Sequence, residues 1–347
     1  MAMTIADIAK LAGVSRATVS GVLNSSPTVS EKTKKRVLEI IKKHDYRPNE
    51  IARALALNQT GLLGLIVKDI SNPFYNNIAL GVEQVCEEGN YSVIIGSTRQ
   101  DWNREVAHIN LLKRRRVDGL VIFPLQRDAD LSHIWELKHT NYPFVLLAEV
   151  PGIEADLVRA DDGSGAEMAT EHLIKLGRKR IAHVLGPATA MASERRLRGY
   201  QRALARYNRV SKDELIHQGG MRLSDGYRAG LEMARDSKAG IDGVFCYNDS
   251  VAIGLIRAMT ESGRRIPDDV AVIGFDDAGA SAYLETALTT VLQPAREMGR
   301  LAAEMVLRRI REREAPLPIQ KQILKTRLVV RETCGANPKG TVAANSN

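Results

Sequence analysis

The chain has 347 residues, of which 26% are charged and 44% hydrophobic, and its formal net charge is +8. This length favours two or three domains, and no apolar run approaches the ~20 residues that a membrane-spanning helix needs. The three cysteines lack the spacing of a zinc site or a disulfide framework, and the first residues lack an apolar secretory signal. We therefore expect a cytoplasmic protein with reduced thiols, no metal and no cofactor.

The positive charge is concentrated near the N-terminus. Residues 1–60 carry ten lysines and arginines against five acids. A small basic segment on a nearly balanced body is typical of proteins that bind nucleic acid. On charge alone, a solvated basic face without a partner remains an alternative.

Three short helices are predicted in this basic segment. Thr4 can cap the first, "IADIAKLA", whose apolar residues recur at helical spacing until Gly13 ends it. Ser15 can cap the second, "RATVSGVLN", and the third begins at Ser30 and runs to about His44. Helices joined in this way by a tight glycine turn are typical of a helix-turn-helix, whose second helix enters a DNA major groove.

The second helix combines a buried stripe with small outward side chains. Val19, Val22 and Leu23 form the predicted stripe. Small outward side chains let a helix approach base edges closely, so we expect Arg16 to contact a guanine and Ala17 to pack on a thymine methyl. The outward residues are Arg16, Ala17, Ser20, Gly21 and Asn24.

A fourth helix is predicted after Pro48, where Asn49 can cap "EIARALA". Its apolar stripe includes Ile51 and Leu55. Helices below ~12 residues are marginal in water. This segment therefore needs a partner in order to fold.

From residue 61 onward, short apolar runs alternate with amphipathic helical stretches, which predicts βαβ units and parallel sheets. The first series is "LLGLIVKD", "YSVIIGS", "DGLVIFPL" and "PFVLLAEV"; the second is "RIAHVLGP", "ELIHQGG", "DGVFCYND" and "DVAVIGFDD". Two series predict an α/β body of two doubly wound parallel-sheet lobes. We expect the lobes at about 61–160 with 292–320 and at 161–291 with 321–335, followed by a disordered tail at 336–347.

Polar and aromatic residues gather at the predicted carboxyl ends of these strands, where doubly wound folds bind ligands. Acids, amides, arginine and an aromatic face are the groups that bind polyols. Asn248, Asp249 and Asp277 could instead cap the helices that follow them. The predicted effector-binding residues are Asn72, Phe74, Tyr75, Phe123, Glu149, Asp161, Arg196, Asn248 and Asp276.

Two other functions fit parts of the sequence. The acid pairs Asp161/Asp162 and Asp276/Asp277 raise the possibility of a glycosidase. Neighbouring acids at a strand end usually point apart, however, and no catalytic nucleophile elbow, P-loop or zinc-protease motif is present. A periplasmic sugar-binding protein fits the body but not the basic head or the missing signal. We therefore expect a binding protein and not an enzyme.

Taken in order, several motifs resemble the lactose/galactose-repressor family of bacterial transcription regulators. They are "MTIADIAKLAGVSRATVSGVLN", "VSEKTKKRVLEIIKKHDYRPNEIARALA", "GLIVKDISNPFY", "VDGLVIF", "ERRLRGY", "CYNDSVAIG", "IPDDVAVIGFDD" and "ALTTVLQP". The resemblance implies a helix-turn-helix head at 1–48, a hinge helix and linker at 49–60, and an effector-binding and dimerisation body at 61–335 that is like a periplasmic binding protein.

The resemblance also implies partners and site residues. It implies a homodimeric, nucleoid-associated repressor of a pseudo-palindromic DNA operator, controlled by a sugar or sugar derivative bound between the lobes. It assigns effector contact to Arg196, Asn248 and Asp276, and it assigns Leu55 to a wedge in the minor groove, although Leu55 could instead pack on the body. The implied DNA-binding residues are Thr4, Ser15, Arg16, Ala17, Thr18, Ser20, Gly21, Asn24, Tyr46, Asn49 and Leu55.

Overall fold

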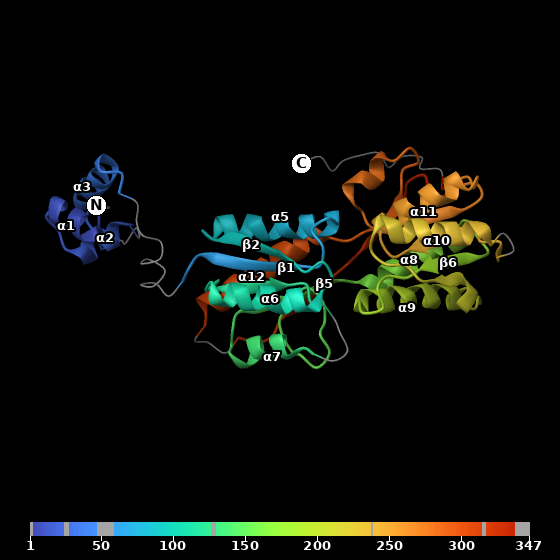
Figure 1. Cartoon of the computed structure of the whole chain (residues 1–347), viewed down its shortest axis with the longest axis horizontal. Coiled ribbons are helices and arrows are strands. Elements are labelled where there is room, and N and C mark those ends of the chain that lie inside the picture. Colours follow the sequence, from blue (N-terminus) through green and yellow to red (C-terminus); the bar gives the residue numbers. More distant parts are fainter. Residues whose placement is uncertain are drawn as a thin grey trace. The chain divides into compact units, whose positions relative to one another are not determined.

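The computed structural model describes residues 3–23, 28–46, 59–125, 130–236, 239–313 and 317–336. The chain divides into two compact units, Met1–Thr60 and Gly61–Asn347 (Figure 1). Among the described residues, no helix is long and apolar enough to cross a membrane. Residues 49–58 of the predicted hinge helix and linker (49–60), and residues 337–347 of the predicted tail (336–347), lie outside the described residues.

The first unit is a three-helix head, and its helix ends are set by local sequence. The Thr4 hydroxyl accepts a hydrogen bond from the Asp7 amide while the Asp7 carboxylate accepts one from the Thr4 amide, a reciprocal cap. Gly13 ends α1 with a φ of +61°, a left-handed conformation that favours glycine. The predicted helix-turn-helix is confirmed. The helices are α1 (Ile5–Ala12), α2 (Arg16–Leu23) and α3 (Glu31–Lys43).

The apolar stripes of these helices meet in one small core. Leu23 of the predicted stripe is only partly buried against this core, as are Ile5, Ile40 and Ile41. The fully buried members are Ile8, Ala9, Ala12, Val19, Val22 and Val37.

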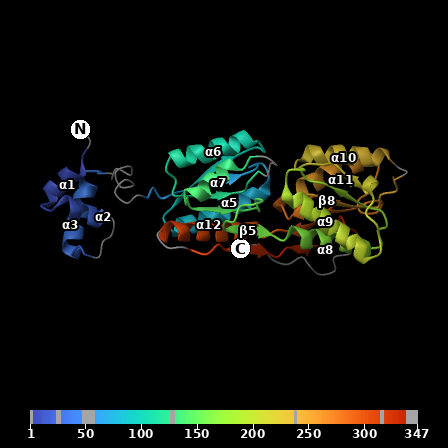
Figure 2. The same cartoon turned by 90° about the horizontal axis from the view of Figure 1, so that it is seen from below.

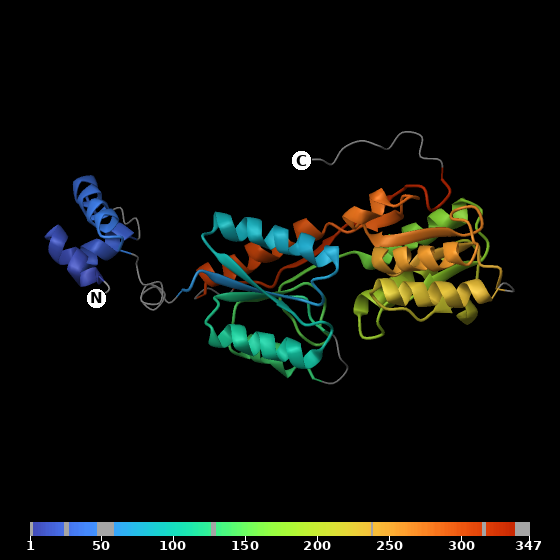
Figure 3. The ribbon, with the colours of Figure 1, turned by 45° about the horizontal axis from the view of Figure 1, so that its top comes forward.

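The second unit begins with a six-stranded parallel sheet of order β11-β5-β4-β3-β1-β2. Helices α5 and α12 pack on one face, and α6 and α7 pack on the other (Figure 3). The elements of this first lobe are β1 (Leu62–Val67), α5 (Pro73–Glu88), β2 (Ser92–Ser97), α6 (Trp102–Arg114), β3 (Gly119–Ile122), α7 (Ser132–His139), β4 (Phe144–Leu146), β5 (Leu157–Ala160), α12 (Ala295–Arg311) and β11 (Lys321–Leu324).

A second six-stranded sheet has the order β12-β10-β9-β8-β6-β7, and only β12 runs antiparallel to its neighbour. Helices α10 and α11 cover one face, and α8 and α9 the other (Figure 2). The two doubly wound lobes are thus confirmed. The elements of this second lobe are α8 (Asp162–Lys175), β6 (Ile181–Val184), α9 (Met191–Arg206), η1 (Asp213–Leu215), β7 (Ile216–His217), α10 (Leu223–Arg235), β8 (Gly243–Cys246), α11 (Asp249–Glu261), β9 (Ala271–Asp276), η3 (Gly279–Tyr283), β10 (Thr289–Leu292) and β12 (Arg327–Val329).

Glycines allow α5 and α12 to cross closely over the first sheet. A Cβ added to Gly81 would lie 1.9 Å from the Arg296 carbonyl oxygen, and one added to Gly299 would lie 2.1 Å from the Ile78 carbonyl oxygen. Any side chain at either position would therefore push the helices apart.

The predicted boundary between the lobes is wrong at one point. Residues 321–335 were expected in the second lobe, but β11 pairs with β5 in the first sheet, with Lys321 opposite Leu157. The strand is a short, exposed edge strand, so it lacks the apolar run that would identify its sheet. The chain crosses between the lobes three times, after β5, after β10 and after β11.

Candidate functional site

A cleft lies between the two lobes at the carboxyl ends of strands from both sheets, where such folds bind ligands. Its volume is about 40 Å³, enough for only a few water molecules. A larger ligand therefore requires side chains or lobes to move apart. The lining residues are Lys68, Asn72, Phe74, Tyr75, Phe123, Leu147, Ala148, Arg159, Ala160, Asp162, Ala192, Arg195, Arg196, Met221, Tyr247, Asn248, Asp276, Gln293 and Met298.

Aromatic rings from the first lobe form one wall of this cleft. The rings of Phe74, Tyr75 and Phe123 contact one another edge to face, with centroids 5.2 to 6.1 Å apart. The Asn72 side chain caps α5 by accepting a hydrogen bond of 2.9 Å from the Phe74 amide, which fixes the start of the wall. All four are predicted effector residues, and the wall offers an apolar surface for C–H groups.

Arg196, from α9, is the central cation of the cleft and is only 4% exposed. It donates two hydrogen bonds to Asp162, at 2.8 and 3.0 Å, and another to the Tyr247 carbonyl oxygen. Its guanidinium lies 3.6 Å from the centroid of the Phe275 ring. Burial opposes its charge, but the adjacent Asp162 carboxylate outweighs burial and raises the pKa of Arg196.

The acid beside Arg196 is Asp162, and the prediction of Asp161 is corrected. Asp161 does not line the cleft, because its side chain caps α8 by accepting hydrogen bonds from the Ser164 amide and hydroxyl, at 3.1 and 2.7 Å. Consecutive residues at the start of a helix point in different directions. Both acids were noticed in the sequence, but the sequence does not show which of the two side chains lines the cleft.

Glu149 is also absent from the lining, contrary to the prediction. Its carboxylate instead pairs with Arg159, at 3.1 Å, and with Arg195, both of which do line the cleft. Arg195 belongs to the second lobe and Glu149 to the first, so this pair bridges the lobes. Glu149 thus contacts two lining residues without lining the cleft itself.

Asn248 and Asp276 lie in the cleft as predicted. Asn248 also caps α11 by accepting a hydrogen bond from the Val251 amide at 2.8 Å, so the capping alternative holds as well. Asp276 ends β9 with a φ of +123°, a conformation that strains any residue but glycine. It accepts a hydrogen bond of 2.6 Å from Gln293, and burial raises the pKa of Asp276 to about 8.

Asp249 and Asp277, the other residues considered as caps, have different partners. Asp249 is buried and accepts hydrogen bonds from the Ala278 amide and the Ser281 hydroxyl, both at 2.7 Å. Asp277 pairs with Arg331 at 2.7 Å. Neither lines the cleft.

Four charged residues line the cleft but were not predicted to bind the effector: Lys68, Arg159, Asp162 and Arg195. Lys68 is the most unusual of them. It follows β1 directly and is 6% exposed, with its ammonium 4.9 Å from the centroid of the Phe123 ring. Burial lowers the pKa of Lys68 to about 8. The available signal was a lysine placed immediately after a continuous apolar strand.

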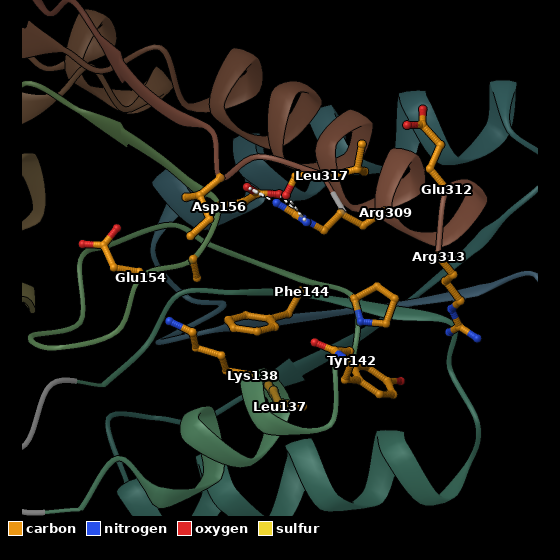
Figure 4. Close-up of a pocket in the computed structure, with 14 residues that line it drawn as sticks. Leu137, Lys138, Tyr142, Phe144, Glu154, Asp156, Arg309, Glu312, Arg313 and Leu317 are labelled. Atoms are coloured by element: carbon orange, nitrogen blue, oxygen red, sulfur yellow. Dashed lines mark hydrogen bonds and ion pairs between the residues drawn. The ribbon is translucent and has the colours of Figure 1, made fainter. Parts of the chain in front are cut away.

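A larger cavity of about 500 Å³ lies within the first lobe, between α7 and the end of α12 (Figure 4). Its central charges are paired, because Arg309 donates hydrogen bonds of 2.6 and 2.8 Å to Asp156. Phe144 and Pro143 place it at the amino end of β4, and its lining includes Arg313 and Leu317. Parallel sheets bind ligands at the opposite strand ends, so the cleft between the lobes is the stronger site.

In the head, the first turn of α2 presents the predicted base-reading residues. Ser15, Arg16 and Ala17 are exposed, whereas Ser20 and Gly21 are half-buried. The Ser15 hydroxyl caps the helix by accepting a hydrogen bond of 3.0 Å from the Thr18 amide. The exposed N-terminal turn is the part of such a helix that reaches base edges.

Some of the other predicted DNA-binding residues already have partners within the head. The Thr4 hydroxyl donates to Asp7 at 2.7 Å, and the Thr18 hydroxyl bonds that of Ser15 at 2.9 Å. Tyr46 packs partly against the head core. Asn24, Asn49 and Leu55 lie outside the described residues.

Two known protein families match parts of this chain. Residues 4–49 match the family described as bacterial regulatory proteins, lacI family, and residues 170–334 match a periplasmic binding protein-like domain. The HTH-type transcriptional repressor PurR of Aliivibrio fischeri (strain ATCC 700601 / ES114) is 34% identical over 313 residues, which are 90% of this chain and 93% of that protein.

Two solved structures have the same architecture. The complex of the transcriptional regulator CelR with cellobiose is 32% identical, with a TM-score of 0.72 over 95% of this chain and 99% of that one. The lac repressor dimer bound to operator and the anti-inducer ONPF is 26% identical, with a TM-score of 0.84 over 97% of this chain and 100% of that one. The chain belongs to the lacI family of bacterial regulatory proteins: it is a DNA-binding transcriptional regulator controlled by a small-molecule effector, and not an enzyme.

Proposed function

We propose that this protein is a homodimeric repressor whose affinity for a pseudo-palindromic operator is set by a sugar or sugar derivative bound in the cleft between the lobes. The observation that carries the proposal is the cleft itself, in which an aromatic wall faces buried polar side chains at the carboxyl ends of both sheets. The cellobiose bound to CelR supports a sugar, and the operator-bound lac repressor dimer supports a dimer.

The polar residues of the cleft suit hydroxyl groups. Burial raises the pKa of Asp276 to about 8, which favours the protonated carboxyl at neutral pH, and a protonated carboxyl can donate a hydrogen bond as well as accept one. Arg196 is held rigid by Asp162 and can direct its remaining N–H groups at a ligand oxygen. Asn248 is oriented by its capping bond. Such preorganised polar groups determine ligand orientation, while the aromatic wall supplies apolar contact.

On the DNA side, Arg16 and Ala17 are the proposed base-reading residues, supported by their exposure at the start of α2. One helix-turn-helix contacts only a few base pairs, so two heads on a twofold-symmetric operator are needed for specificity. The DNA-bound dimer is then associated with the nucleoid. Leu55 is the proposed minor-groove wedge of the hinge.

Effector and DNA binding are linked through the arrangement of the lobes. Two ion pairs bridge the lobes, one between Glu149 and Arg195 and one between Asp69 and Arg222 at 3.7 Å. A ligand that binds one lobe arrangement better than the other shifts the population toward it. Such a shift changes the spacing of the two hinges in a dimer and thereby the affinity for the operator.

The test combines calorimetry with gel shifts on the full-length protein. Neutral and charged sugars are titrated into the parent, Asp276→Asn and Asp277→Asn, and the binding sugar is then added to a gel shift with the protein's own promoter region. Asp276→Asn should weaken binding by about tenfold or more, because one buried ligand contact is altered. Asp277→Asn is the matched control, since this neighbour pairs with Arg331 outside the cleft.

Equal affinity in the parent and both variants would contradict the cleft as the effector site. A sugar that binds but leaves the gel shift unchanged would contradict its role as effector.

A further inference from the structure

We propose that the effector carries an anionic group, a carboxylate or a phosphate, and that Lys68 binds this group in the cleft. The inference rests on the proposed function, because it assumes that the cleft holds the effector. It adds the chemical class of the ligand and the residue that selects it.

The position of Lys68 is unusual for a lysine. It directly follows the buried strand β1 and is only 6% exposed, yet it lines the cleft. Its ammonium lies over the Phe123 ring, 4.9 Å from the centroid. Lysines normally extend their ammonium into water, so a buried lysine at the wall of a narrow cleft is a candidate binding residue.

The arginines of the cleft already have carboxylate partners. Arg196 pairs with Asp162 at 2.8 Å, and Arg159 and Arg195 share Glu149. In the described parts of the chain, no carboxylate lies within ion-pair distance, 4.0 Å, of the Lys68 ammonium. Glu105 and Asp162 act on the Lys68 charge only from farther away, and both already pair with another residue, Glu105 with His133 and Asp162 with Arg196. Lys68 is therefore a cation of the cleft wall that no carboxylate of the described residues contacts directly.

The remaining acid in the lining does not fill this role. Asp276 accepts a hydrogen bond from Gln293, and burial raises its pKa, which favours the protonated carboxyl at neutral pH. The aromatic contact with Phe123 compensates the Lys68 charge only in part, because burial still lowers the pKa of Lys68. An anion on the ligand would supply the missing partner and would be favoured over an uncharged ligand of the same shape.

The test uses pairs of sugars that differ at one carbon, where the charged member carries a carboxylate or a phosphate. Isothermal titration calorimetry compares D-glucose with D-glucuronate and D-glucose 6-phosphate, D-galactose with D-galacturonate, and D-ribose with D-ribose 5-phosphate, on the full-length protein. We expect at least one anionic member to bind about tenfold or more tightly than its neutral partner. A gain confined to the uronates identifies a carboxylate, and a gain confined to the phosphates identifies a phosphate.

Two variants locate the charge that is responsible. Lys68→Met has a similar length and no charge, and it should remove the preference for the anion, so that the anionic and neutral members of each pair bind with similar affinity. Lys138→Met is the matched control, because Lys138 also lies over an aromatic ring, 5.6 Å from the Trp135 centroid, but lines the larger cavity of Figure 4. It should keep the preference.

Three outcomes overturn this inference without contradicting the proposed sugar effector. The first is equal or tighter binding of the neutral sugar by the parent protein, which depends on no variant. The second is a preference that survives Lys68→Met. The third is a preference lost in Lys138→Met, which would move the anion to the larger cavity. Absence of binding by every sugar contradicts the proposed sugar effector and this inference with it, whereas binding of neutral sugars alone contradicts only the inference.

Discussion

Removing the charge of Lys68 should stabilise the ligand-free protein. Burial lowers the pKa of Lys68 from its ordinary 10.5 to about 8. At pH 7 the side chain is charged in both the folded and the unfolded chain, and its charge disfavours the folded state. Each pKa unit corresponds to ~1.4 kcal/mol, so Lys68→Met should raise the free energy of unfolding by up to about 3 kcal/mol at pH 7.

This increase in the free energy of unfolding should depend on pH. As pH rises from about 8 toward 10.5, the folded protein has already lost the proton while the unfolded chain still binds it, so the parent protein recovers stability relative to the variant. The difference should therefore fall to about 1 kcal/mol at pH 10 and vanish above the unfolded pKa.

Urea unfolding at pH 7 and pH 10 measures this difference. Both tryptophans, Trp102 and Trp135, lie on helices of the first lobe, the lobe that contains Lys68, so their fluorescence reports the relevant transition. Lys138→Met serves as control and should change stability little at either pH. A Lys68→Met protein that is less stable than the parent at pH 7, or equally stabilised at both pH values, would refute the reasoning.

Four further changes test other parts of the molecule. Gly81→Ala should lower the free energy of unfolding by about 1 to 3 kcal/mol in urea titrations, because its Cβ would meet a backbone carbonyl of α12, whereas Gly279→Ala, with open space around its Cβ, should be tolerated. Burial lowers the pKa of His183 from 6.5 to about 4, so the unfolded chain binds a proton first as pH falls, and the free energy of unfolding should drop by about 3 kcal/mol between pH 6.5 and 4. His183→Gln should flatten this drop in urea titrations, and an unchanged drop would contradict a neutral His183 in the folded protein. Arg16→Ala should lose about 1 to 3 kcal/mol at one operator base pair in competition gel shifts, and equal weakening on every sequence would indicate a phosphate contact instead. Leu55→Ala should weaken operator binding and reduce DNA bending in circular-permutation gel shifts while sugar affinity stays intact, and bending like that of the parent protein would contradict the wedge.

The features that could be predicted from sequence depend on residues close together in the chain. The caps at Thr4 and Ser15 and the turn at Gly13 involve contacts within a few residues, so they follow from local chemistry. The two lobes follow from the alternation of apolar strands and amphipathic helices. Strand β11 was assigned to the wrong lobe because it is short, polar and at an edge, so nothing in its side chains selects one sheet over the other.

The cleft was predictable in composition but not in detail. Its residues come from strand ends, which the topology brings together. Which of Asp161 and Asp162 faces inward depends on the geometry of one helix start, and the role of Glu149 depends on Arg195, a residue of the other lobe. Lys68 was missed because the burial of a lysine depends on what packs over it, and here that is Phe123, distant in sequence.

The three crossings between the lobes have a consequence for biosynthesis. The apolar face of the first sheet and of α5 is covered by α12, whose buried residues include Ala302 and Val306, and the sheet gains its edge strand β11 only afterwards. The ribosome therefore delivers nearly the whole second lobe before the first lobe can complete its core. During that interval the nascent chain exposes an unfinished apolar surface, the kind of surface that recruits chaperones or aggregates. A fragment ending at residue 292 should fail to fold for the same reason, because it lacks α12 and β11. The two lobes are separate in space, but neither is encoded by one continuous segment of the gene.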